Sequence, residues 1–198
     1  MTTTRVRQLA ELGAPGAAIG VVAGTVVAAM SLLVGMPVSW AIVGMLTLGV
    51  PLALVGGAYG VVVGLGRVRP GTFAPAALFW LVGFPVSRLV HETFTPVVLG
   101  GRPTPPDDVL TFLAFQGLVS FGFAIGFVWL FERITPAWLI SIKDRNPAAE
   151  QLFARYTAYA AAVWEARERR RARRTVRLGT RPGTAPAGPA ARAKARRS

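Results

Sequence analysis

The chain has 198 residues, of which 53% are hydrophobic and 16% charged, and its formal net charge is +13. Its apolar residues are concentrated in runs of about 20, the length that crosses a hydrocarbon layer of roughly 30 Å. This composition excludes an ordinary soluble domain. The lack of cysteine excludes disulfides and thiol chemistry, and the single histidine excludes zinc patterns such as H-E-x-x-H.

Four apolar runs predict an all-α integral membrane protein with four membrane-spanning helices, at residues 14–36, 38–66, 71–98 and 109–131. They make up a predicted membrane domain, 14–135, which follows a cytoplasmic amino terminus, 1–13. The first run has no clear cleavage site after it and is expected to be an uncleaved signal-anchor helix. Pro51 should kink or locally open the second helix.

The arginines of the short loops predict the orientation, because such residues favour the cytoplasmic side. Arg5 and Arg7 precede the first span, and Arg67 and Arg69 separate the second from the third. Residues 133–198 carry 16 Lys and Arg against 4 Asp and Glu, whereas the first 132 residues carry 6 against 5. Both termini and the middle loop are therefore predicted to be cytoplasmic. The preference for Arg over Lys, with abundant Ala, Gly, Val and Pro, suggests a high-GC bacterial genome. The predicted location is the plasma membrane of such a cell.

Small residues recur at four-residue spacing within the spans, which lets a second helix backbone approach closely. Three spans carry this pattern, at Gly16, Gly20 and Gly24, at Gly56, Gly60 and Gly64, and at Gly122 and Gly126. One interpretation is that these faces hold the four-helix bundle together. The other is that they bind a partner subunit or a second copy.

The stretch FPVSRLVHETFTP (84–96) places Arg88, His91 and Glu92 within an apolar segment. Arg88 lies about 28 Å along a helix counted from Arg69, so it is predicted near the outer membrane edge. Glu92 shares a helix face with Arg88 at i, i+4 spacing. Further candidate partners on the outer side and in the fourth span are Asp107, Asp108 and Gln116.

This polar cluster has two main interpretations. It is a structural clasp between the third and fourth spans, or it is a ligand, ion or partner site that opens outward, since ionisable residues at membrane depth are functional candidates. Hydrolysis by Ser87 and His91 is disfavoured, because Glu92 is about 100° around the helix from His91 and cannot orient it as a triad requires. A proton-linked role for His91 stays open.

The carboxyl-terminal third predicts an interfacial and amphipathic cytoplasmic region, 136–175, and a disordered basic tail, 176–198. A helix should begin with Asn146 as its N-cap and Pro147 at its first position. Its apolar stripe includes Leu152, Tyr156 and Tyr159. Seven arginines follow and are expected to contact anionic lipid headgroups or a partner protein, namely Arg167, Arg169, Arg170, Arg171, Arg173, Arg174 and Arg177. Nucleic acid is disfavoured, because no aromatic residue follows Trp164 and no nucleic-acid-binding fold is present.

The sequence contains no Walker loop, dinucleotide fingerprint, metal cluster or catalytic triad, so no cofactor, metal or catalytic residue is predicted. The leading hypothesis is a non-enzymatic accessory or scaffold subunit of a larger bacterial membrane complex, or a homo-oligomer. The alternative is a small oligomeric transporter, channel or ligand-binding membrane protein that uses the cluster of Arg88, His91 and Glu92.

Overall fold

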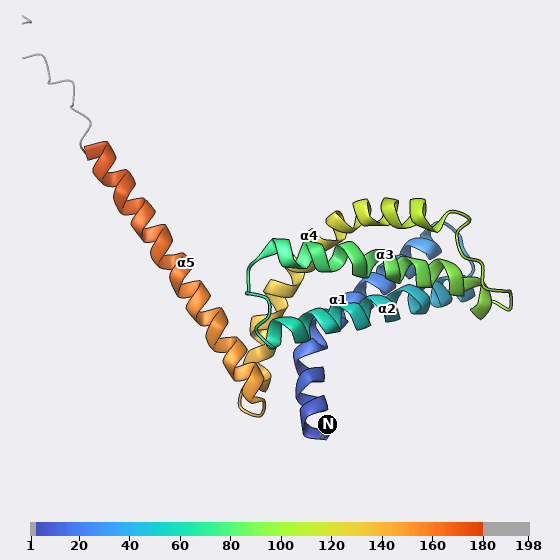
Figure 1. The fold of residues 1–198 in the computed structure, drawn as a ribbon, viewed down its shortest axis with the longest axis horizontal. Coiled ribbons are helices and arrows are strands. Elements are labelled where there is room, and N and C mark those ends of the chain that lie inside the picture. The colour runs from blue at the N-terminus through green and yellow to red at the C-terminus, as the bar shows by residue number, and fades with distance from the viewer. Residues whose placement is uncertain (1–2, 180–198) are drawn as a thin grey trace, which may run out of the picture. The chain divides into compact units, whose positions relative to one another are not determined.

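The computed structural model describes residues 3–179, and within that range all regular structure is helical. Figure 1 shows the five helices in chain order, which are α1 (Thr3–Leu33), α2 (Val38–Gly64), α3 (Phe73–Val98), α4 (Val109–Ile142) and α5 (Pro147–Gly179). The first four are long and apolar enough to cross a membrane, which confirms the prediction of four such helices. The chain divides after Tyr156 into two compact units, the first holding α1–α4 and the start of α5.

Helices α1 and α2 pack backbone to backbone through their glycines. A Cβ atom placed on Gly16 or on Gly56 would collide with the carbonyl oxygen of the other residue. A Cβ on Gly24 would lie 2.7 Å from the Cα of Gly49, and one on Gly60 would lie 2.7 Å from the carbonyl oxygen of Leu12. Close approach of this kind maximises van der Waals contact where no hydrophobic effect drives helices together. The glycine faces of the first two spans are therefore used within the chain.

Aromatic rings fill the space between α2, α3 and α4. Trp80 and Phe127 are almost fully buried, with ring centroids 4.6 Å apart. Tyr59 meets Phe127 and Phe131 edge to face at 5.4 and 5.3 Å. Such contacts add about 0.5–1.5 kcal/mol each beyond the area they bury. Phe127 and Phe131 thus form a packing surface of α4, and Gly122 and Gly126 lie exposed on a different face of the helix.

Helix α4 runs to Ile142 rather than ending near residue 131 as the sequence predicted. Pro136 lies inside it, and a proline there removes a hydrogen bond and predicts a break. Burial outweighs that loss, because Leu139 and Ile142 lie in the hydrophobic core of the first unit. The predicted interfacial segment is therefore a continuation of the fourth helix.

Helix α5 begins where the sequence predicted. The Asn146 side-chain oxygen accepts hydrogen bonds from the backbone N–H groups of Ala148 at 3.1 Å and Ala149 at 3.3 Å, so its N-cap role is confirmed. Leu152 and Tyr156, the first residues of the predicted stripe, are buried. The helix continues through Gly179, past the predicted start of the disordered tail at 176. Residues 180–198, the rest of that tail, lie outside the described residues.

Candidate functional site

Arg88 and Glu92 form the predicted i, i+4 ion pair on α3. The Nη2 atom of Arg88 lies 3.6 Å from Oε2 of Glu92, and the two side chains are 25% and 49% exposed. Within residues 3–173 no ion pair joins Arg88 to Asp107 or Asp108, so the predicted clasp through these aspartates is not formed. The ion pair of Arg88 is confined to its own helix.

Asp108 has a local role instead. Its Oδ1 accepts a hydrogen bond from the Thr111 backbone N–H at 3.0 Å, and its Oδ2 accepts one from the Thr111 hydroxyl at 2.6 Å. These bonds hold the pKa of the Asp108 carboxyl below its usual range. Asp108 is the N-cap of α4 and starts that helix at the end of the loop that follows α3. Asp107 beside it is exposed.

In a bilayer centred on α3, Arg88 would lie deeper than the outer rim that the sequence predicted. The count from Arg69 included loop residues, whereas α3 begins only at Phe73. At 1.5 Å per residue, Arg88 lies about 22 Å from Phe73 and about 15 Å from Val98. A hydrocarbon layer of about 30 Å centred on α3 would enclose it.

His91 faces α2, where it takes part in a small hydroxyl network. Its Nδ1 lies 2.8 Å from the Thr47 hydroxyl and 3.2 Å from that of Thr95, and the two hydroxyls are 2.9 Å apart. Each threonine also donates to the backbone carbonyl one turn earlier, so the network favours a proton on Nδ1 of His91. This joins α2 to α3, whereas the sequence predicted a clasp between α3 and α4. Ser87 donates to the Gly83 carbonyl at 2.8 Å.

Sequence reasoning missed Thr47 and Thr95. A threonine in an apolar helix ordinarily satisfies its hydroxyl on the carbonyl four residues back, and both residues do so here. Nothing in the local sequence therefore distinguishes them. The one available signal is the position of Thr95 four residues after His91, which puts both side chains on one helix face.

A cavity of about 510 Å³ is lined by residues of α1, α2, α3 and α4. Its wall is apolar except for Arg88 and Gln116. Gln116, which the sequence indicated as a candidate partner of the cluster, is only 8% exposed. The structure brings Gln116 and Arg88 to the same cavity, with His91 turned toward α2 instead.

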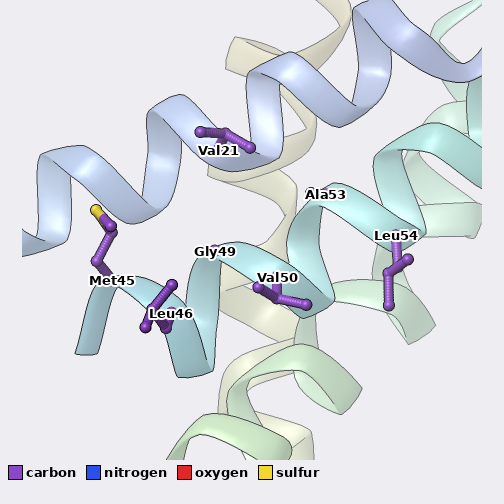
Figure 2. Close-up of a pocket in the computed structure, with 7 residues that line it drawn as sticks. All are labelled: Val21, Met45, Leu46, Gly49, Val50, Ala53 and Leu54. Carbon is purple, nitrogen blue, oxygen red and sulfur yellow. The ribbon is translucent and has the colours of Figure 1, made fainter. Parts of the chain in front are cut away.

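A smaller cavity of about 170 Å³ lies between α1 and α2. Figure 2 shows its lining, with Val21 on α1 above Leu46 and Val50 of α2, and with Met45 directed toward α1. Every lining residue is apolar or glycine. It therefore offers no group that could orient a ligand, unlike the larger cavity.

The amino-terminal part of α1 and the junction of α4 with α5 meet in a polar node. The Glu11 carboxylate accepts hydrogen bonds from Arg145 Nε at 3.3 Å and from Asn146 Nδ2 at 3.1 Å. The Glu11 backbone carbonyl accepts one from Trp138 Nε1 at 2.7 Å. Asn146 Nδ2 also donates to the carbonyl of Gln8 at 3.0 Å. Asn146 is fully buried, so this node fixes α1 against the carboxyl-terminal half of the bundle.

The remaining predicted residues lie on the surface. Gly122 and Gly126 are exposed, and in the described part of the chain no atom outside their own stretch of α4 lies within 4 Å of a Cβ placed on either. The arginines 167, 169, 170, 171 and 173 are exposed on α5, where Arg169 pairs with Glu165 at 3.4 Å. The side chains of Arg174 and Arg177 lie outside the described part of the chain.

Comparison with protein-family models, with curated proteins and with solved structures finds no match to this chain. Among the residues that the structure describes, no group of three or more His, Cys, Asp or Glu is placed to hold a metal ion.

Proposed function

We propose that this chain is a non-enzymatic accessory or scaffold subunit of a bacterial membrane complex. The observation that supports this is the contrast between its glycine faces. The glycine faces of α1 and α2 pack against each other, whereas Gly122 and Gly126 of α4 have open space in front of them. Leu118, Ile125 and Trp129 are exposed on the same α4 face, which would let a partner helix approach closely.

Affinity purification of the full chain from its own membranes in mild detergent tests this role. Gly126→Leu should reduce co-purification of stoichiometric partners, because it fills the smooth face without touching the bundle. Ala18→Leu, on an exposed position of α1, is the matched control and should retain the partners. A native mass corresponding to a lone monomer for the unmodified chain would reject the accessory role.

The proposed setting is the plasma membrane, with both termini in the cytoplasm and the basic α5 residues next to anionic headgroups. Each basic residue near such headgroups contributes on the order of 1 kcal/mol. Because the chain has no cysteine, Pro105→Cys in the loop between α3 and α4 creates a single labelling site. It should react with an impermeant maleimide on intact spheroplasts. Reaction only after lysis would reverse the orientation.

A second candidate function is small-ligand binding or transport, and the cavity that contains Arg88 and Gln116 favours it. At about 510 Å³ the cavity falls within the range of ligand sites, and it has the usual make-up of an apolar wall with a few polar groups. A variant that no longer binds a measured ligand but still co-purifies with its partners would separate ligand binding from the accessory role.

A further inference from the structure

We propose that the cavity among α1–α4 binds a single-chain anionic amphiphile, a long-chain carboxylic acid. Its carboxylate contacts Arg88 and Gln116, and its hydrocarbon chain lies along the apolar wall. This inference rests on the second candidate function and is independent of the accessory role. A partner complex and a bound carboxylate can each be present without the other.

The two polar groups of the cavity are incompletely satisfied by the protein. Gln116 is 8% exposed, and no described residue makes a hydrogen bond to its side-chain amide. Its amide atoms are not among the fully enclosed polar atoms that lack a partner, so the NH₂ group is accessible in the cavity and can donate to a bound group. Arg88 has one ion pair at 3.6 Å, which leaves most of its five N–H donors available. A carboxylate fits this set, because it can accept two bonds from the guanidinium and one from the amide.

The apolar wall indicates that the anion carries a long tail. Apart from Arg88 and Gln116, the lining consists of aliphatic and aromatic residues and alanine. Val26 of α1 and Phe115 of α4 line the cavity and are also exposed on the outside of the bundle. In a four-span membrane protein that surface faces hydrocarbon, so the opening admits a ligand from the bilayer. The volume of about 510 Å³ is in the range that accepts a drug-sized ligand, which favours one chain over the two of a phospholipid.

The charges of Glu92 and Arg88 should have opposite effects on the affinity for the carboxylate. The Glu92 carboxylate competes with an incoming anion for the guanidinium of Arg88, and its side chain is 49% exposed, so the packing of the bundle does not hold it in place. Removing the charge of Glu92 should therefore strengthen binding, whereas removing that of Arg88 should weaken it. A merely structural ion pair predicts similar harm from both changes.

Radiolabelled oleate, measured by equilibrium binding to the full chain in a non-ionic detergent, tests the site. Arg88→Gln should weaken binding between about tenfold and a hundredfold, as for a hydrogen bond to a charged group, and Gln116→Leu by up to about tenfold. Glu92→Gln should tighten it about threefold or more, since it removes a competing like charge. Val119→Trp should fill the cavity and abolish binding. Arg102→Gln, in the exposed loop after α3, is the matched control and should leave the affinity unchanged.

Competing probes identify what the site recognises. Excess unlabelled oleate should displace the label, whereas methyl oleate and acetate should not, because one lacks the anion and the other the chain. Equal competition by methyl oleate would overturn the role of Arg88. Displacement by phosphatidylglycerol with no oleate binding would show that the occupant is a phospholipid and would also overturn the proposal. Thermal unfolding of each variant verifies the fold, and if Arg88→Gln does not fold, unchanged oleate affinity in Val119→Trp would still reject the site.

Discussion

Gly16→Val should prevent α1 and α2 from packing and should destabilise the bundle by more than about 3 kcal/mol, at or beyond the upper end for overpacked cores. The added side chain would meet the carbonyl oxygen of Gly56, which is backbone and cannot rotate away. The two helices would have to separate along their whole contact. Thermal unfolding in detergent, followed by size-exclusion chromatography, measures the loss of the monodisperse folded peak.

Gly126→Val is the control for this prediction, because it makes the same chemical change in the middle of another span. Among residues 3–179, no atom outside the neighbouring turns of α4 lies within 4 Å of a Cβ at Gly126. The variant should therefore match the unmodified chain to within about 0.5 kcal/mol, as is usual for surface substitutions. Equal destabilisation by both variants would mean that helix propensity, and not the crossing of α1 with α2, controls stability.

The second large effect is expected at Asn146. Asn146→Ala removes the N-cap bonds to Ala148 and Ala149 and the two bonds that Nδ2 donates to Gln8 and Glu11. A lost N-cap costs about 1 kcal/mol, and a lost bond to a charged group about 1.5–3 kcal/mol. The variant should therefore be destabilised by about 3 kcal/mol. The midpoint of thermal unfolding in detergent measures it.

Asn146→Asp separates the two roles of this residue. Aspartate keeps the acceptor that caps α5 but loses both donors and places a negative charge next to Glu11. It should be at least as destabilising as Asn146→Ala at neutral pH, because like charges at close range repel. A midpoint near that of the unmodified chain would show that capping alone accounts for Asn146 and that its bonds to α1 contribute little.

Several features of this protein follow from the sequence alone, because they depend on residues close together in the chain. Hydrophobic length located the four spans, and the pair Asn146–Pro147 located the start of α5. The i, i+4 spacing of Arg88 and Glu92 predicted their ion pair. The glycine repeats indicated smooth helix faces, although not which helix each face would meet.

The tertiary structure decided which helix faces meet and where the polar groups lie. Glu11 and Asn146 are distant in sequence, and only the folding of α1 against the junction of α4 and α5 brings them into contact. Burial of Leu139 and Ile142 extends α4 through Pro136, against its local preference. Packing of four helices likewise brings Arg88 and Gln116 to one cavity and turns His91 away from it. Periodicity assigns a residue to a face of its own helix, but the neighbour of that face depends on the packing of the whole bundle.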